Sequence, residues 1–361
     1  MLPLELIQQI MAWRFQNALH SFPSFSKDWD RINQQRANHI LLDSLFINPL
    51  LRNFGSKKLL LAVCENAQAP RMALIEPARP GFWQTFQAGQ APLGAIVLTE
   101  ADDAAAQSME DLLRALPGFA LGLSVTQQDP DFTCFGNLNG NPAVETLDYI
   151  QTPRLTICGK YEDYWKQRSK NLTHNLSRQR RRLKEQGGVL ELSTDRNAKA
   201  VPDALREYGL LESTGWKGEE GSAVAADNVQ GRFYREMLEN FCHRGEAVIY
   251  RLRLNGTTVA SDLCLERNGT LFILKTAYDE NVPGLSLGLL LHQEIFQSVF
   301  EERKIRVIEF YGRLRDWHTK WTNEIRTMYH INFYRSAWVP RLRKMVKPTL
   351  SFGRGLVAHW Q

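Results

Sequence analysis

Residues 281–288, Asn-Val-Pro-Gly-Leu-Ser-Leu-Gly, form the segment whose composition best suits a phosphate-bearing ligand. Gly284, Ser286 and Gly288 precede an apolar run, extending to residue 300, that is typical of a helix. Glycines let backbone N–H groups approach a phosphate, and a helix N-terminus adds about half a positive charge. We therefore expect these three residues and the backbone of Leu289 to bind such a ligand. On local sequence alone, an ordinary loop with Ser286 as N-cap explains the segment at least as well.

Three side chains near this loop could move protons. Glu309 ends a strand-like run, where burial could raise its pKa so that it serves as a base. His318 has an ordinary pKa close to neutrality, and Asp316 could orient it. Tyr278 ends another strand beside the loop and could donate a proton. Each has a structural alternative: an exposed strand-end charge, a polar residue packed between tryptophans, and an aromatic residue of the core.

An aromatic side chain beside a cation could line a groove for the acceptor of a transferred group. Trp216-Lys217 is such a pair, and sugars stack well on the face of an indole ring. A turn with a packed tryptophan explains the pair nearly as well. We group Asp316 and Trp317 with it as candidates for acceptor binding.

The elements that position these residues are predicted by hydrophobic alternation and turn chemistry. Strand-like runs cover residues 246–254, 257–266 and 270–278. Asn255-Gly256 and Asn268-Gly269 join them, as two-residue hairpins require, because both central positions need positive φ. The loop, the helical run and a strand at 305–310 follow. The sequence thus predicts an antiparallel meander that leads into the loop.

The whole chain predicts a mixed α+β (α/β) architecture in two domains, residues 1–145 and 146–335, followed by a basic tail at 336–361. The first domain reads as helices, antiparallel strands, a helix and a strand, beginning with an apolar helix that ends before Pro23. A turn-rich stretch at 127–143 separates the domains. The second domain begins with a strand and one long helix over residues 162–186, and its order of elements resembles that of the first.

Composition and missing motifs exclude several classes of protein. The chain has 361 residues and five scattered cysteines without a C-x-x-C pair, so neither a disulfide framework nor a zinc site is supported. We expect no metal cofactor. The absence of P-loop, dinucleotide, H-E-x-x-H and G-x-S-x-G motifs argues against nucleotide hydrolases, dehydrogenases, zinc proteases and α/β-hydrolases. We see no signal peptide and no run of about 18 apolar residues, so a soluble or peripheral protein of the cytoplasm is expected.

Positive charge is concentrated in two stretches. Eight Lys/Arg and no acid lie between residues 166 and 184, and seven Lys/Arg and no acid lie from 325 to 361. Without these fifteen cations the net charge of +5 becomes −10. The first stretch is explained by a solvated helix face, and nucleic acid is not an expected partner. The C-terminal tail pairs aromatic residues with cations, so it could rest on an anionic membrane surface or pack back on the protein.

Four motifs together resemble a known family. They are NLSRQRRRLKEQGGVLEL, STGWKG, LKTAYDENVPGLSLGLLLHQEI and IEFYGRLRDWHTKWT. They resemble the CelD/BcsL-type family, whose members are GNAT-like acetyltransferases of cellulose and exopolysaccharide synthesis related to the Fem peptidyltransferases. The resemblance covers residues 154–335, and it implies tandem GNAT-like domains, each a mostly antiparallel sheet flanked by helices. The family usually has Ser-Pro-Gly where this chain has Ser286-Leu287-Gly288, Asp-Phe where it has Glu309-Phe310, and Tyr-Lys where it has Trp317-His318.

The resemblance implies an acyltransferase that uses acetyl-CoA or another acyl-CoA as cosubstrate, with a sugar hydroxyl or amine as acceptor. Gly284, Ser286 and Gly288 would bind the pyrophosphate, and Glu309 or His318 would assist the acceptor. One alternative is a Fem-like transferase that uses aminoacyl-tRNA, with the basic helix contacting phosphates. Another is a non-catalytic scaffold that binds a synthase or the inner membrane through its basic surfaces.

Overall fold

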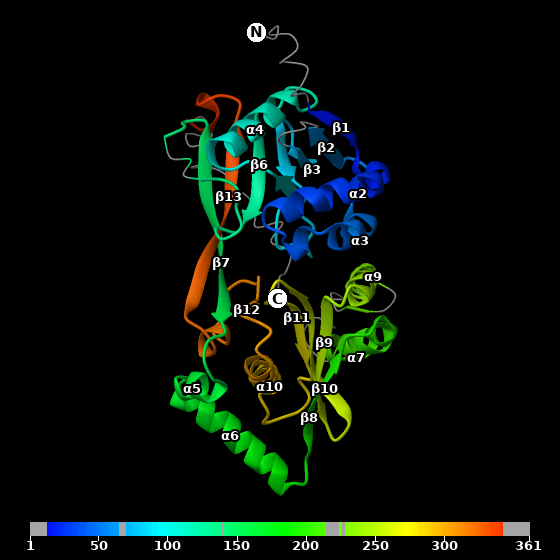
Figure 1. Ribbon diagram of the computed structural model, residues 1–361, viewed down its shortest axis with the longest axis vertical. Coiled ribbons are helices and arrows are strands. Elements are labelled where there is room, and N and C mark those ends of the chain that lie inside the picture. Colours follow the sequence, from blue (N-terminus) through cyan, green and yellow to red (C-terminus); the bar gives the residue numbers. More distant parts are fainter. Residues whose placement is uncertain are drawn as a thin grey trace. The chain divides into compact units, whose positions relative to one another are not determined.

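The computed structural model describes residues 13–64, 70–136, 138, 140–213, 224–225 and 228–341, and it divides into two compact units. Unit 2 is Thr152–Ile325, and unit 1 consists of the residues before and after it. Residues 326–335, which the sequence places with the second domain, therefore lie in unit 1. Strands β7 (Val144–Thr156) and β13 (Glu324–Tyr334) each pass from one unit into the other (Figure 1).

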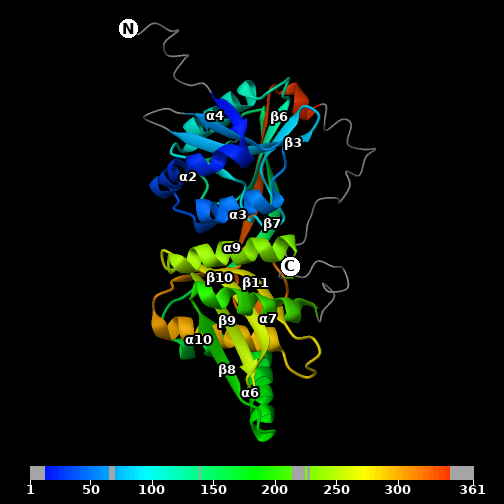
Figure 2. The ribbon, with the colours of Figure 1, turned by 90° about the vertical axis from the view of Figure 1, so that its right-hand side faces the viewer.

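Unit 1 contains a mostly antiparallel sheet with the strand order β1-β2-β3-β4-β6-β13, and β5 pairs with β3. Its strands are β1 (Arg14–Asn17), β2 (Leu60–Cys64), β3 (Arg71–Arg79), β4 (Phe82–Thr85), β5 (Ile96–Leu98) and β6 (Gly122–Gln128). Its helices are α2 (Ala18–Gln35), α3 (Ser44–Phe54), α4 (Asp102–Ala115) and the short 3-10 helix η1 (Ile40–Leu42). Figure 2 shows α4 and the pair α2 and α3 beside the strands. The core on the α4 side joins apolar residues of this helix to β2, β3, β6 and β13.

The predicted N-terminal helix is wrong over residues 14–17 and at its end, whereas residues 18–22 are helical as predicted. Residues 14–17 form β1, whose backbone pairs with β2. Helix α2 starts at Ala18, with Asn17 as N-cap, and continues through Pro23. Phe22, on the buried face of this helix, is fully buried. Burial of such a side chain outweighs the hydrogen bond that a proline removes from the helix. Residues 1–12 lie outside the described part of the chain.

Unit 2 contains a sheet with the order β7-β12-β11-β10-β9-β8, antiparallel except for the parallel pair β11 and β12. Its remaining strands are β8 (Leu190–Asp195), β9 (Ala247–Leu254), β10 (Thr257–Arg267), β11 (Thr270–Tyr278) and β12 (Val307–Glu309). Its helices are α5 (Tyr161–Lys166), α6 (Lys170–Glu185), α7 (Val201–Ser213), α9 (Val229–His243), α10 (Leu287–Glu302) and the short η2 (Ala198–Ala200) and η3 (His318–Lys320). Figure 1 shows α10 on one side of β8–β11 and α7 and α9 on the other, which we call the α10 face and the α7 face. The mixed α+β class with mostly antiparallel sheets flanked by helices is confirmed.

The two hairpins of the meander are confirmed residue by residue. Asn255 and Gly256 have φ of 50° and 82°, and Asn268 and Gly269 have φ of 53° and 77°. Asparagine and glycine tolerate positive φ better than other residues, so the turns fix the register of β9, β10 and β11. The single helix predicted over 162–186 is wrong, because Ser169 begins a new helix, α6, by accepting a hydrogen bond from Leu172 N–H.

Candidate active site at the separation of two parallel strands

Strands β11 and β12 lie side by side for only a short distance. Thr270, Leu271 and Phe272 pair with Val307, Ile308 and Glu309, after which β12 ends and β11 continues to Tyr278. In β11, Leu274 is an extra residue between Ile273 and Lys275, which pair with consecutive residues of β10. Such a β-bulge bends a strand and increases its twist. The bulge therefore lies where β11 and β12 separate. Beyond it, the edge of β11 that faced β12 has no paired strand among the described residues.

The bulge also decides which side chains face α7. Leu271 and Ile273 belong to the core on the α10 face, so an unbroken alternation would place residue 275 there too. The extra residue instead directs Lys275 to the α7 face. There its Nζ lies 3.4 Å from Glu212 Oε1, and both side chains are largely buried.

The Lys275–Glu212 pair was missed by sequence reasoning. Tyr208 also donates a hydrogen bond to Glu212 Oε1 (3.2 Å), and Val224 N–H donates to Oε2 (2.7 Å). The available signal was one lysine inside the apolar run of β11, and one acid in α7 directly before the Ser-Thr-Gly-Trp-Lys-Gly segment. The Glu212 carboxylate therefore holds the positively charged Lys275 side chain near the point where β11 and β12 separate.

Glu309, the predicted base, is 1% exposed at the end of β12. Alternation along β12 places it on the α7 face, because Ile308 and Phe310 belong to the opposite core. Arg154 of β7 lies directly opposite it in the strand pairing, with Nη1 4.0 Å from Glu309 Oε1. Arg154 Nε also lies 3.7 Å from Glu324 Oε2. The carboxylate is thus held near a cation at the point where the two strands separate.

The predicted phosphate loop lies at the N-terminus of α10, against α6. Gly284 has φ of 78°, and a Cβ there would lie 3.7 Å from Arg182 Nη1. Gln179 of α6 accepts from Ser286 N–H (2.9 Å) and donates to the Ser286 hydroxyl (3.1 Å). Ser286 is therefore already engaged by the protein. The backbone of Leu287, Gly288 and Leu289, with Arg182 nearby, is the part that fits a phosphate.

Tyr278 lies across the first turn of α10. A Cβ on Gly288 would lie 3.3 Å from the Tyr278 ring, so the glycine allows this approach. The tyrosine is 46% exposed, which fits a reacting group better than the core role that sequence also allowed. Burial, and then the negative charge of Glu280, raises the pKa of Tyr278. The hydroxyl consequently stays protonated and able to donate near neutral pH.

His318 has the wrong geometry for a general base. Its Nδ1 accepts a hydrogen bond from Arg315 N–H (3.0 Å), so the neutral ring carries its proton on Nε2 and has no free lone pair. Burial, and then the charge of nearby His292, lowers the pKa of His318 from 6.5 to about 3. The Arg315 backbone occupies the nitrogen that Asp316 was expected to orient, and Asp316 is exposed. We do not carry the base role of His318 further.

The depressed pKa of His318 makes stability depend on pH. The folded state keeps the ring neutral down to a pKa of about 3, whereas the unfolded chain takes up a proton near pH 6.5. Stability is therefore fully present above pH 6.5 and lost as pH falls toward 3. We expect His318→Phe to remove about 2–3 kcal/mol of the stability difference between pH 7 and pH 4.5, measured by urea unfolding. His330, whose pKa burial lowers to about 4, is the matched comparison, and an unchanged pH profile in His318→Phe would contradict the prediction.

A second buried pair lies on the α10 face and was also missed. His292 Nε2 of α10 lies 3.1 Å from Asp262 Oδ2 of β10, and the two residues are 2% and 0% exposed. The His292 ring stacks on Trp317 (5.0 Å between centroids) and Phe296 (5.6 Å). Trp317 in turn stacks on His318 at 3.6 Å. Trp317, predicted to bind the acceptor, thus belongs to an aromatic cluster around a buried polar pair.

Three predicted acceptor residues remain, and the structure describes one of them. Trp216 and Lys217 lie outside the described residues. Asp316 lies on the surface, where its carbonyl accepts from the Thr319 hydroxyl (2.8 Å). Glu309, Tyr278 and the loop at 281–288 are all attached to the ends of β11, β12 and α10. Tyr278 therefore lies against the predicted donor loop, whereas Glu309 lies at the level of Phe272, six residues earlier along β11.

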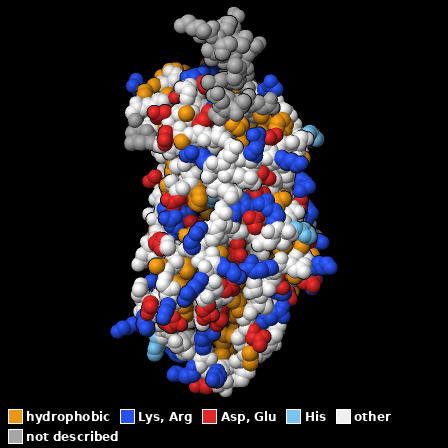
Figure 3. All heavy atoms as spheres, in the orientation of Figure 1, with side chains coloured by type: hydrophobic (Ala, Val, Ile, Leu, Met, Phe, Trp, Pro, Cys, Tyr) orange, Lys and Arg blue, Asp and Glu red, His pale blue; other side chains and the backbone are white. Residues whose placement is uncertain are grey.

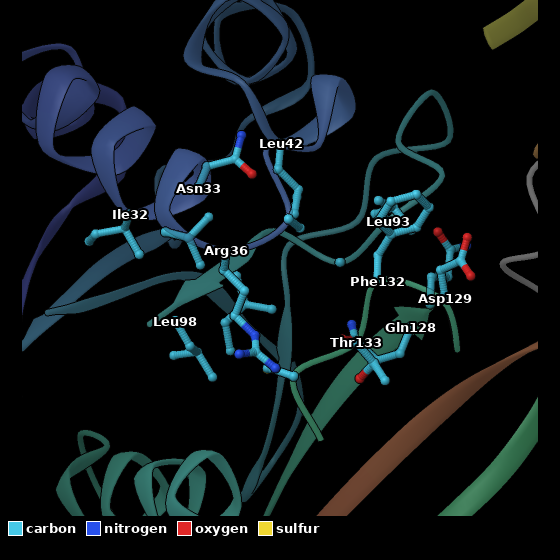
Figure 4. Close-up of a pocket in the computed structure, with 16 residues that line it drawn as sticks. Ile32, Asn33, Arg36, Leu42, Leu93, Leu98, Gln128, Asp129, Phe132 and Thr133 are labelled. Carbon is cyan, nitrogen blue, oxygen red and sulfur yellow. The ribbon is translucent and has the colours of Figure 1, made fainter. Parts of the chain in front are cut away.

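Unit 1 repeats the strand separation with different chemistry. Its β4 and β6 pair in parallel over three residues, Phe82–Gln84 with Gly122–Ser124, and β6 continues to Gln128 paired with β13 and no longer with β4. Beyond this point lies a cavity of ≈ 50 Å³ that Figure 4 shows among residues of α2, β5 and the end of β6. The corresponding helix, α4, starts with Asp102 and Asp103. These acids stabilise the helix N-terminus and repel a phosphate there.

No group of three or more His, Cys, Asp or Glu side chains is arranged to hold a metal ion within the described ranges. Among the helices that the structure describes, none is long and apolar enough to span a bilayer.

Comparison with known proteins assigns the class. Residues 170–319 match the family described as "Acetyltransferase (GNAT) domain". The fold of unit 2 is that of a GNAT domain. No curated protein sequence matches the chain.

Solved structures extend the similarity to both units. The C-terminal domain of a protein named as a lysylphosphatidylglycerol synthetase from Agrobacterium fabrum is 14% identical, covers 87% of this chain and 95% of its own, and has a TM-score of 0.50. L-PGS from Bacillus licheniformis is 13% identical, with coverages of 89% and 95% and a TM-score of 0.50. FemX is 8% identical, with coverages of 89% and 98% and a TM-score of 0.50. At such identities the likeness concerns the fold, and the tandem GNAT-like architecture is confirmed.

Proposed function

We propose that unit 2 transfers an acyl group from acyl-CoA to a hydroxyl or amine of a saccharide. The observation that carries this proposal is the separation of β11 from β12 after Phe272, with the N-terminus of α10 against Tyr278 at the far end of β11. Beyond Phe272, the edge of β11 that faced β12 can form backbone hydrogen bonds with the amide groups of an extended donor, as it would with an added strand. The first turn of α10 can bind the diphosphate at the other end of the same donor.

We assign the proton transfer from the acceptor to Glu309, which lies where β11 and β12 separate. Glu309 would take the proton of the acceptor hydroxyl or amine as its oxygen or nitrogen forms a bond to the thioester carbonyl carbon. The sulfur would leave as a thiolate as the carbon–sulfur bond breaks, while Tyr278, whose ring lies against the first turn of α10, would contact the diphosphate end of the donor. Lys275, held by Glu212, would stabilise negative charge near the reacting carbonyl.

We propose a saccharide acceptor because the chain shares motifs with the CelD/BcsL-type family. The same motifs are the reason to propose a role in exopolysaccharide or cellulose synthesis. Trp216 and Lys217 would contribute to the acceptor site. Their part of the chain follows directly from α7, which carries Glu212 on the same face as Glu309. Trp216 and Lys217 therefore follow Glu212 closely in the sequence.

A second candidate is transfer from aminoacyl-tRNA. It is favoured by the exposed cations Arg178, Arg181, Arg182 and Lys184 of α6, because Arg182 borders the donor loop at Gly284. Basic and acidic side chains are elsewhere interspersed over the visible surface (Figure 3). Binding of tRNA through such a helix would weaken steeply with salt.

Calorimetry with acetyl-CoA tests the proposal. Gly284→Trp should abolish binding, because it introduces a large side chain into the donor loop beside Arg182. Gly187→Trp is the matched control: Gly187 is also exposed and has φ of 75°, close to the 78° of Gly284, but it lies at the end of α6 with no atom near its Cβ position. Binding by the parent and the control, with loss in Gly284→Trp, would support acyl-CoA as donor. Absence of binding by the parent would overturn it, and titration with aminoacyl-tRNA would then separate the second candidate from a scaffold.

A further inference from the structure

Large apolar side chains at the surface of the described residues are few, and two aromatic ones lie near one end of unit 1. The exposed ones are Phe119, Val189, Leu210, Val229, Tyr278, Ile325 and Trp338. Phe119 is 71% exposed and Trp338 is 51% exposed. Single exposed apolar residues are ordinary in soluble proteins, so their surroundings decide whether they matter.

The surroundings of Phe119 and Trp338 are joined by hydrogen bonds into one surface. The turn between β3 and β4 meets the segment after α4, because Leu121 N–H donates to the Gly81 carbonyl (2.7 Å). The segment after β13 meets it too, because Arg335 N–H donates to the Leu121 carbonyl (2.9 Å). Trp338 follows Arg335 by three residues. The turn between β3 and β4, the segment after α4 and the segment after β13 thus form one end of unit 1. We call this surface, which carries Phe119 and Trp338, the aromatic end.

Cations accompany the aromatic rings at this end. The Arg335 guanidinium lies over the Phe119 ring at 4.7 Å, and the Arg79 guanidinium lies over the Phe82 ring at 4.0 Å. Prolines Pro77, Pro80 and Pro117 are exposed beside them. Two neighbouring acids, Glu110 and Asp111 on α4, share Arg114, and Glu145 accepts a hydrogen bond from the Tyr334 hydroxyl (2.9 Å). The aromatic end is therefore apolar, with the guanidinium groups of Arg79 and Arg335 beside its rings.

The sequence that continues from the aromatic end carries the same chemistry. Three residues after Trp338 stands Arg341, and Arg343, Lys344 and Lys347 follow, with no acid from 325 to the last residue. Trp360 and Phe352 are in this stretch too. Aromatic residues favour the boundary between lipid headgroups and acyl chains, and clustered cations favour anionic headgroups.

We propose that the aromatic end of unit 1 binds the surface of an anionic lipid bilayer. Phe119 and Trp338 insert at the level of the headgroups, while Arg79 and Arg335 contact the lipid phosphates. A guanidinium stacked on a ring brings a cation and an apolar face to the same place on the surface. This inference is independent of the acyl donor proposed for unit 2.

Co-sedimentation of the full chain with vesicles tests the proposal. We expect binding to vesicles of phosphatidylcholine with phosphatidylglycerol, weakened by salt, and little binding to phosphatidylcholine alone. The double variant Phe119→Ser/Trp338→Ser should lower the partition coefficient by about tenfold or more, because it removes both inserted rings. Leu210→Ser/Val189→Ser is the matched control, since these residues of unit 2 are 64% and 54% exposed. The control should bind like the parent.

A second measurement distinguishes vesicle binding by the aromatic end from vesicle binding by the C-terminal tail. A chain that ends at Arg341 should retain the difference between the parent and the Phe119→Ser/Trp338→Ser variant, although both bind more weakly. Circular dichroism should show that all variants are folded, because the replaced side chains are exposed. The proposal is overturned if the parent does not bind anionic vesicles, or if the Phe119→Ser/Trp338→Ser variant binds them as strongly as the parent. It is also overturned if the rings are needed only for self-association seen by analytical ultracentrifugation.

Discussion

Glu309→Gln should lower kcat for acyl transfer by about 10²–10⁴-fold, the usual contribution of a general base. The side chain keeps its size and its place at the end of β12, but the amide cannot accept the proton of the acceptor. Because Glu309 lies at the strand end and not in the loop at the α10 N-terminus, the dissociation constant for acetyl-CoA should stay close to that of the parent. Single-turnover kinetics and calorimetry check the two parts of this expectation.

Glu324→Gln is the matched control for Glu309→Gln. Both carboxylates lie near the Arg154 guanidinium, at 4.0 Å for Glu309 and 3.7 Å for Glu324, but the Glu324 side chain is 42% exposed. A general effect of removing a charge beside Arg154 would appear in both variants. If Glu309→Gln and Glu324→Gln lower kcat equally, or if Glu309→Gln turns over like the parent, Glu309 is not the base. Lys275 and Glu212 would then be the next groups to replace.

His292→Leu should lower the free energy of unfolding by about 3–5 kcal/mol. The change leaves the Asp262 carboxylate buried at 0% exposure without its partner, and an unpaired buried charge is costly. Asp262→Leu should have an effect in the same range for the complementary reason. The double variant Asp262→Leu/His292→Leu should lose much less than the sum, because it replaces the pair with apolar side chains among aromatic rings.

Urea unfolding of the four proteins, the parent, both single variants and the double variant, gives the coupling energy. A coupling of at least about 1 kcal/mol would show that Asp262 and His292 stabilise each other. Strictly additive losses would mean that each side chain contributes through packing alone. The same variants report on the site, because His292 stacks on Trp317 beside the end of β12. Weaker acyl transfer with unchanged donor binding would indicate that the pair positions this aromatic cluster.

Some of the candidate site could be read from the sequence because its signals are local. A glycine such as Gly284 before an apolar helical run indicates a loop in which the backbone itself can bind, and its positive φ fits that expectation. Glu309 and Tyr278 were identified because each stands at the end of a strand-like run. Such signals depend on residues that are close together in the chain. The break between α5 and α6 was missed because a regular leucine spacing continues across it, and Ser169 was not recognised as a helix start.

The pairs on which the site depends could not be predicted in the same way. Glu212 and Lys275 are separated by 63 residues, and they meet because the extra residue Leu274 turns Lys275 to the α7 face. A bulge shows in the pairing of two strands and not in the composition of one. A charged residue inside an apolar run was a usable signal for Lys275, Asp262 and His292. It indicates that a partner must exist but does not say which one.

The sequence by itself determined the meander, its two Asn-Gly turns and the loop before α10, because these depend on backbone conformations that neighbouring residues specify. It also determined the class, through motifs spread over the second half of the chain. Only the tertiary structure decided that His318 has its Nδ1 occupied, that Ser286 is held by Gln179, and that Phe119 and Trp338 stand exposed on one end of unit 1. Those outcomes depend on contacts between segments far apart in the chain, where burial and hydrogen bonding are set by the fold and not by the local sequence.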